Sequence, residues 1–124
     1  MGANEKMGLP FGKMKKIAIC FDVDGTLINN HGGTIQDTNR LLRSVLLQKW
    51  KNVDVIVWSG GGKSYAEKVV SRIWPDLSGA GTHKIKFFSK EDHLKIREKY
   101  QLILAIDDIQ DTAIGDVNLI VRNQ

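Results

Sequence analysis

Five short apolar runs, separated by longer stretches of mixed polarity, constrain the fold of this chain more than any other feature. The runs are continuous rather than alternating, which is typical of parallel strands buried on both faces. They occupy residues 17–22, 53–59, 85–89, 102–107 and 117–121. Because parallel strands need crossover connections, this order predicts an α/β, Rossmann-like fold with three α/β/α layers around a mostly parallel five-stranded sheet.

The stretches between the runs have the spacing of amphipathic helices. Apolar residues recur at three- and four-residue steps over residues 35–51, 63–74 and 91–100. Thr34 is the expected N-cap of the first helix, and Ser89 or Lys90 begins the third. A short turn is expected near residues 111–114, and residues 76–82 are expected to form a surface loop. Core packing is expected for all three tryptophans, Trp50, Trp58 and Trp74.

Length and composition indicate one domain in a reducing compartment. The chain has 124 residues, of which residues 1–13 are treated as a flexible leader and residues 14–124 as a single domain. Its single cysteine, Cys20, excludes an internal disulfide, and its apolar neighbours favour a core position. We find no run long enough to span a bilayer and no signal-peptide pattern, so a cytoplasmic protein is expected.

The stretch WSGGGKS, residues 58–64, raises the question of nucleotide binding. A P-loop needs a glycine five residues before the Gly-Lys-Ser, and Val57 stands there instead. A strand that ends in a serine, followed by glycines and a helix start, can still bind one phosphate through backbone amides. We therefore expect a clamp for a single phosphate, with Lys63 as an early residue of the following helix.

Acidic residues follow two of the apolar runs. The first run leads into DVDGT, with Asp22 and Asp24, and the fourth leads into DDIQD, with Asp107, Asp108 and Asp111. Carboxylates gathered at neighbouring strand ends would repel one another strongly, so a hard cation with oxygen ligands is expected, and Mg²⁺ fits best. A calcium loop is excluded because a strand precedes the acids and the twelfth position lacks glutamate.

The spacing of the first two acids also predicts different chemical roles for them. Asp22 and Asp24 lie two residues apart, so on an extended backbone both would point the same way. Gly25 then allows a sharp turn out of the strand. One carboxylate could attack a phosphorus atom while the second delivers and removes protons.

These residues resemble the motifs of the haloacid dehalogenase superfamily of phosphotransferases. FDVDGTL resembles the first motif, the strand ending at Ser59 the second, and IDDIQD the fourth, and the similarity extends over residues 16–121. The resemblance implies an Mg²⁺-dependent phosphomonoester phosphatase that works through an aspartyl-phosphate. It also implies a substrate that is a phosphorylated small molecule or an accessible macromolecule.

The resemblance also implies a role for each matching position. Asp22 would be the nucleophile, Asp24 the general acid and base, and Thr26 a residue that supports Asp24 near the phosphate. Ser59 and Gly60 would bind the phosphoryl oxygens. The Mg²⁺ ligands would come from the acidic residues of both motifs, namely Asp22, Asp24 through its backbone carbonyl, Asp107, Asp108 and Asp111.

The family's third motif is a lysine, and three candidates remain for it. Lys90 fits best, at the end of a predicted strand and 17 positions before Asp107, and Lys84 and Lys86 are the alternatives. Only 34 residues lie between Asp24 and Ser59, which leaves no room for the cap domain of many family members. An open site of the capless branch is therefore expected. The loop of residues 27–34 would cover it, with His31 exposed in solvent.

Two other functions are retained as hypotheses. The net charge of +4, from 18 basic and 14 acidic residues, and the open site would suit a phosphatase of nucleic-acid 3′ or 5′ phosphate ends. The other hypothesis is a non-catalytic, metal-binding regulatory module of the same fold. Association into an oligomer could close the open site, while the substrate itself is not determined by these patterns.

Overall fold

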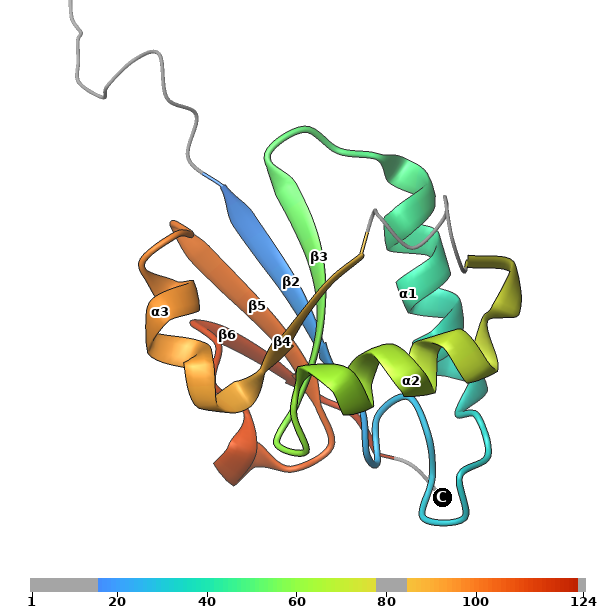
Figure 1. The fold of residues 1–124 in the computed structure, drawn as a ribbon. Coiled ribbons are helices and arrows are strands. Elements are labelled where there is room, and N and C mark those ends of the chain that lie inside the picture. Colours follow the sequence, from blue (N-terminus) through green and yellow to red (C-terminus); the bar gives the residue numbers. More distant parts are fainter. Residues whose placement is uncertain (1–15, 78–84, 123–124) are drawn as a thin grey trace, which may run out of the picture.

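The structure is a computed structural model that describes residues 16–77 and 85–122. Its centre is a five-stranded sheet in the order β4-β3-β2-β5-β6, and every neighbouring pair is parallel (Figure 1). The strands are β2 Ile17–Asp22, β3 Val53–Ser59, β4 Ile85–Ser89, β5 Leu102–Asp107 and β6 Val117–Ile120. The predicted fold class is thus confirmed, and the predicted strands are present with a shift of one residue at the end of β6.

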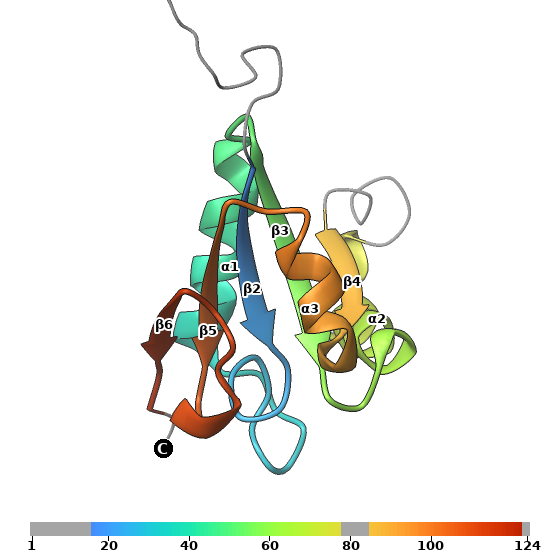
Figure 2. The same ribbon diagram turned by 90° about the vertical axis from the view of Figure 1, so that its left-hand side faces the viewer.

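Helices cover both faces of the sheet. The helices α1 Gln36–Gln48 and α2 Lys63–Ile73 pack on one face, and the short helix α3 His93–Arg97 lies on the other (Figures 1 and 2). Alternate side chains of β2 divide between the two cores. Phe21 packs with the α1 and α2 side, whereas Cys20 packs with Ile96 of α3. This alternation follows from the two-residue period of a strand, and it produces three layers.

The third helix is shorter than predicted. Instead of one helix over residues 91–100, the 3₁₀ turn η3 Lys90–Asp92 precedes α3, which ends at Arg97. The Ser89 hydroxyl accepts a hydrogen bond from the Glu91 N–H, as expected for a residue that begins this segment. The predicted late turn is η4 Gln110–Thr112, somewhat earlier than residues 111–114.

Two expectations about the first helix were wrong. Its N-cap is Ile35 rather than Thr34, and no side chain caps it, because Thr34 pairs with Ile28 in an isolated bridge. Trp50 was expected in the core but is 51% exposed. The helix ends at Gln48, and Lys49 adopts a left-handed backbone conformation with φ 51°. Trp50 therefore follows the helix and is not on the helix face that packs in the core.

The register of the strands brings polar residues to one edge of the sheet. Asp22 pairs with Trp58, so Ser59 lies one residue beyond it, and Ser59 pairs with Ser89 of β4. On the other side Phe21 pairs with Ile106, which places Asp107 beside Asp22. We call this edge, with Asp22, Ser59, Ser89 and Asp107 at the strand ends, the carboxyl edge.

The loop that follows β2 is held against both helices of its face. The Asn39 amide donates to the carbonyl oxygens of Leu27 and Ile35, at 2.8 Å in each case. The same side chain accepts a hydrogen bond of 2.9 Å from the Trp74 indole N–H. A second anchor is the Thr38 hydroxyl, which donates to the Thr26 carbonyl. A buried asparagine thus connects the loop, α1 and the end of α2.

Some predicted segments lie partly or wholly outside the described residues. They include the leader 1–13, Lys84 and most of the loop 76–82, whose start forms the 3₁₀ turn η1 Pro75–Leu77. Between Asp24 and Ser59 the chain forms a loop, α1 and most of β3. Across the described ranges, no helix has both the length and the apolar character needed to cross a membrane.

We expect Asn39→Ala to lower the free energy of unfolding by roughly 1–3 kcal/mol, because it removes a buried side chain that pairs with three partners. Chemical denaturation monitored by circular dichroism would measure this. Gln48→Ala, at an exposed position of the same helix, is the control and should change stability by less than about 0.5 kcal/mol. Equal effects for the two variants would contradict the anchoring role.

Candidate active site

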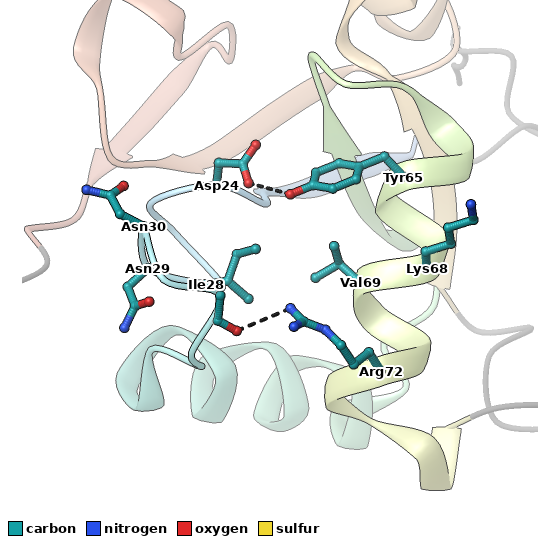
Figure 3. A pocket seen from close by; sticks show the side chains of 9 residues that line it. Asp24, Ile28, Asn29, Asn30, Tyr65, Lys68, Val69 and Arg72 are labelled. Carbon is teal, nitrogen blue, oxygen red and sulfur yellow. Dashed lines mark hydrogen bonds between the residues drawn. The ribbon is translucent and has the colours of Figure 1, made fainter.

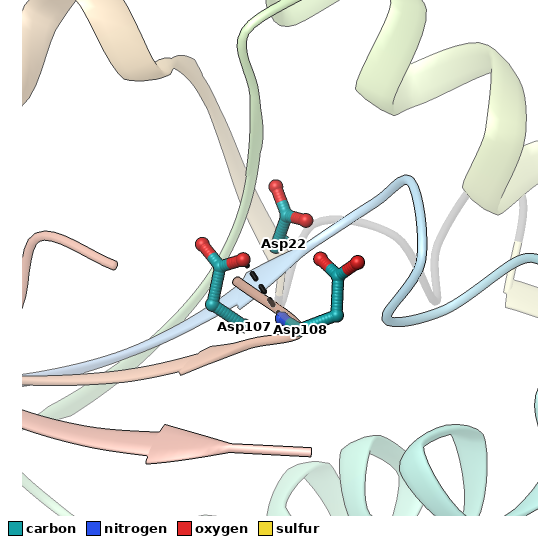
Figure 4. A group of neighbouring side chains, drawn as sticks. All are labelled: Asp22, Asp107 and Asp108. Atoms are coloured by element: carbon teal, nitrogen blue, oxygen red, sulfur yellow. Dashed lines mark hydrogen bonds between the residues drawn. The ribbon is translucent and has the colours of Figure 1, made fainter. Parts of the chain in front are cut away.

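Three carboxylates meet at the carboxyl edge. Asp22 ends β2, Asp107 ends β5 and Asp108 follows it, and each provides an oxygen within 4.8 Å of the others (Figure 4). Asp107 is 1% exposed and Asp22 is 7% exposed. They come together because parallel strands end at the same edge of a sheet, as the sequence predicted.

A single lysine bridges two of these carboxylates. The Lys90 Nζ lies 2.9 Å from Asp22 Oδ1 and 2.6 Å from Asp107 Oδ2. It also donates to the Thr112 carbonyl at 3.4 Å. Burial would lower the pKa of Lys90, but the hydrogen bonds to Asp107 and Asp22 outweigh it and raise this pKa. Lys90 is therefore a fixed positive charge at the centre of the site.

Asp107 is oriented by several donors besides Lys90. Its Oδ1 accepts from the backbone N–H of Asp108 at 2.8 Å (Figure 4) and from that of Ile109 at 3.1 Å. The Thr112 hydroxyl donates to the same oxygen at 3.2 Å. Burial alone would raise the pKa of Asp107, but the hydrogen bonds from Lys90 and from the Ile109 N–H lower it. Asp107 therefore stays ionised, and the crowding of carboxylates instead affects the pKa of Asp22 and Asp108.

The other two acids of the cluster, Asp22 and Asp108, have raised pKa values. Burial raises the pKa of Asp22 to about 6, and the nearby Asp107 and Asp108 add to the rise although Lys90 opposes it. Burial and the contact with Asp107 raise the pKa of Asp108 as well. Three carboxylates with one lysine carry excess negative charge, which a cation would neutralise.

The donor set fits a hard divalent cation. All three groups offer carboxylate oxygens, the ligands that Mg²⁺ prefers. Gly25 makes room for one of them: a Cβ atom on this residue would lie 2.0 Å from Asp108 Oδ2, and its φ of +80° is itself unfavourable for other residues. Asp22, Asp107 and Asp108 are therefore the residues that would hold Mg²⁺.

Asp24 faces another direction. Its carboxylate is exposed and lies outside the cluster, and its Oδ1 accepts a hydrogen bond of 2.6 Å from the Tyr65 hydroxyl of α2 (Figure 3). This bond raises the pKa of Tyr65, so the phenol remains the donor. Asp22 and Asp24 thus differ in environment: one is buried against Lys90 and the other is at the surface.

The predicted phosphate clamp has an ordered and an open part. Ser59 is buried, and its Oγ accepts from the Gly61 N–H at 2.9 Å, which closes a tight turn. Gly60 is exposed, and a Cβ atom placed on it would meet nothing within 4 Å. A ligand could approach the backbone closely at Gly60. Lys63 is the first residue of α2, as predicted.

Three predicted positions differ from expectation. Thr26 is fully buried, and its hydroxyl makes a long contact of 3.4 Å with Asp22 Oδ2 rather than supporting Asp24. Asp111 is exposed on η4 and is not part of the cluster, because Thr112 of the same turn points to Asp107. Lys86 pairs with Asp54 at 2.9 Å, near the opposite edge of the sheet, so it is not the lysine of the site.

Two contacts were missed by the sequence analysis. Thr112 was not singled out, although it directly follows the predicted Asp111. Tyr65 was not considered, because the Asp24 contact joins residues 41 positions apart. Its place two residues into the helix that follows the glycines was the one available signal. His31 is exposed in the loop, as expected.

Comparison with protein-family models, curated protein sequences and solved structures found no match to this chain. The resemblance to haloacid dehalogenases therefore rests on the sequence motifs, and the function is inferred from the side chains at the carboxyl edge.

We expect Mg²⁺ to raise the melting temperature, and this effect should weaken as the pH falls through about 6, because a proton then competes for Asp22. Between about pH 7.5 and about pH 5 the apparent Mg²⁺ affinity should drop roughly tenfold from this group alone. Calorimetric titration and thermal unfolding with Mg²⁺ or with chelator would measure both. Asp108→Asn should weaken the response and the exposed control Asp37→Asn should keep it.

In the metal-free protein, acidification has the opposite effect: Asp22 then contributes more to the stability of the fold. The folded-state pKa of Asp22, about 6, lies above its ordinary value of 3.8, so the folded state binds the proton first on acidification. The contribution of Asp22 to stability therefore increases as the pH falls from about 7 toward about 4. If Mg²⁺ raised the melting temperature equally at about pH 7.5 and at about pH 5, the assignment of Asp22 as a ligand would be contradicted.

We expect Gly25→Ala to lower stability by about 1–3 kcal/mol and to weaken Mg²⁺ binding, because the new methyl group would collide with Asp108 at a positive φ. The matched control is Gly60→Ala, where a Cβ atom meets no neighbour within 4 Å and stability should hold. Unfolding curves and Mg²⁺ titrations of both variants would show whether the close approach of Gly25 to Asp108 shapes the site.

Proposed function

We propose that this protein is an Mg²⁺-dependent phosphomonoester phosphatase of the haloacid dehalogenase type, acting through an aspartyl-phosphate on Asp22. The observation that carries the proposal is the arrangement around Asp22, a buried carboxylate in contact with Lys90 and beside Asp107 and Asp108. An ordinary structural ion pair has no need of three crowded carboxylates. Nucleophile, cation and metal ligands at one edge of a sheet suit phosphoryl transfer.

Asp22 acts as the nucleophile in the first step. One of its carboxylate oxygens attacks the phosphorus atom, and the bond from phosphorus to the ester oxygen breaks. Lys90, at 2.9 Å from Asp22 Oδ1, offsets charge on the transferring group and holds the carboxylate in position. The long contact from Thr26 to the other oxygen limits its rotation. When bound, Mg²⁺ would favour the ionised form of Asp22 and neutralise charge on the phosphoryl oxygens.

Asp24 acts as general acid and then as general base. In the first step it gives a proton to the ester oxygen, which leaves as an alcohol. In the second step it takes a proton from a water molecule, which attacks the phosphorus of the acyl phosphate and releases inorganic phosphate with regeneration of Asp22. The hydrogen bond from Tyr65 orients the Asp24 carboxyl for both transfers.

The end of β3 supplies the phosphate clamp. The exposed backbone at Gly60 gives a phosphoryl group space to approach, and buried Ser59 fixes the turn by accepting from Gly61. Backbone amides at the start of α2 favour an anion at this position. These features support the binding of one phosphate group rather than a nucleotide triphosphate.

We also infer a reducing, cytoplasmic location. Cys20 is the single cysteine of the sequence, and burial raises the pKa of its thiol to about 12, so it does not react as a thiolate. A protein that keeps an inert core thiol has no need of an oxidising compartment.

We expect Asp22→Asn to lower phosphate release on the order of a thousandfold or more, because the amide is no longer a nucleophile. Release from a panel of phosphomonoesters, with Mg²⁺ and with excess chelator, would measure this. Thermal unfolding would check that the variant is folded, and Asp37→Asn, at an exposed position of α1, is the charge-matched control.

The panel has outcomes that would count against the proposal. Turnover retained by Asp22→Asn would refute the nucleophile, and turnover unaffected by chelator would refute the metal. Mg²⁺ binding without release from any phosphomonoester would favour the non-catalytic binding module. Phosphate release only from oligonucleotide ends would favour the nucleic-acid phosphatase.

A further inference from the structure

A pocket of about 540 Å³ lies between α2 and the loop that follows β2, with Asp24 in its wall (Figure 3). This volume is in the range of small-molecule sites. We call it the loop pocket. Its lining residues are Asp24, Ile28, Asn29, Asn30, Gly32, Tyr65, Lys68, Val69 and Arg72.

Asp24 connects the loop pocket to the proposed chemistry. It is the one carboxylate among the described residues that line the pocket, and Tyr65 of the same wall holds it through a hydrogen bond of 2.6 Å. If Asp24 protonates the leaving oxygen, the leaving group must lie on the side of the site that Asp24 faces. The loop pocket is therefore the place for the alcohol part of the substrate, an inference that rests on the proposed function.

The wall formed by α2 is positively charged. Lys68 and Arg72 lie one helical turn apart, and Tyr65 precedes Lys68 by three residues, so all three are on one face of α2. Arg72 donates to the Gly32 carbonyl across the pocket at 3.2 Å (Figure 3). Within the described part of the chain, no aspartate or glutamate lies within salt-bridge distance of Lys68 or Arg72.

Some other cations of the described residues pair with acids, whereas Lys63 and Lys95, for example, have no acidic partner among them. Arg43 pairs with Asp76, Arg97 pairs with Asp116, and Lys90 pairs with two acids. Two cations without acidic partners that line one cavity, next to a general acid, are the arrangement expected for an anionic ligand. Ile28 and Val69 add apolar contact.

We propose that the loop pocket binds the leaving group of a small phosphomonoester that carries a second anionic group, a carboxylate or another phosphate. Lys68 and Arg72 bind that second anion, while the scissile phosphate lies at Asp22. The substrate class is thus phosphorylated acids or bisphosphates of small-molecule size. The neighbouring phosphate of an oligonucleotide has the same chemistry, but the size of the pocket favours a small molecule.

The test compares substrates that differ in the second charge. Glycerol 1-phosphate and 3-phosphoglycerate differ by the replacement of an alcohol with a carboxylate, and a short oligonucleotide with a terminal phosphate represents the macromolecular source. We expect kcat/KM for 3-phosphoglycerate to exceed that for glycerol 1-phosphate by about tenfold or more, as one charge-assisted contact permits. Lys68→Gln and Arg72→Gln should each reduce this ratio.

A charge-matched control separates local binding from net charge. Lys95→Gln removes the same charge from exposed Lys95 on α3, across the sheet, and should keep the ratio. Because Arg72 also contacts Gly32, thermal unfolding of Arg72→Gln would check its fold, and Lys68→Gln provides a variant without that contact. A ratio near one in the unmodified protein, or a ratio unaffected by both pocket variants, would overturn the proposal.

A binding measurement distinguishes failure of this inference from failure of the proposed function. Calorimetry on Asp22→Asn with Mg²⁺ would follow binding of the same two glycerol compounds without turnover. If the unmodified protein hydrolyses neither compound, preferential binding of 3-phosphoglycerate that is lost with Lys68→Gln would support the pocket and reject the phosphatase. Hydrolysis without such preference would reject the pocket alone. A preference confined to the oligonucleotide would overturn the assignment to small substrates.

Discussion

The crowding of three carboxylates at the ends of neighbouring strands is the constraint on which the rest of this structure depends. Asp22, Asp107 and Asp108 each have an oxygen within 4.8 Å of the others, and two of them are almost completely buried. Burial raises the pKa of Asp22 to about 6, and one lysine cannot balance three negative charges. The protein accepts this cost at a place where a bound cation would relieve it, which is the usual compromise between stability and function.

The parallel sheet makes that crowding geometrically possible. Each strand delivers its last residue to the carboxyl edge, and the register pairs the end of β2 with the ends of β3 and β5. The lysine follows β4, which β3 and β2 separate from β5, and it lies in the turn that Ser89 begins. Lys90 can therefore contact Asp22 and Asp107 at once, whereas a lysine within β4 could not.

The loop after β2 links the cluster to the loop pocket. Gly25 passes against Asp108, Asn39 holds the loop to α1, and Arg72 reaches across to Gly32 from α2. The same loop thus shapes the metal ligands on one side and the wall of a charged cavity on the other. In the proposed mechanism the residues that would select the leaving group, Lys68 and Arg72, differ from those that would bind the transferred phosphate.

The sequence by itself determined the strands, the three layers and the acids that meet, because strand periodicity and the spacing of DVDGT and DDIQD are local properties. It left Lys90, Lys86 and Lys84 as alternatives, and only the register of β4 separated Lys90 from Lys86, which pairs with Asp54. It also misjudged Asp111 and missed Tyr65, since the turn η4 and the packing of α2 across the loop decide where those side chains point. Contacts between residues far apart in the chain depend on tertiary packing, and no local pattern contains that information.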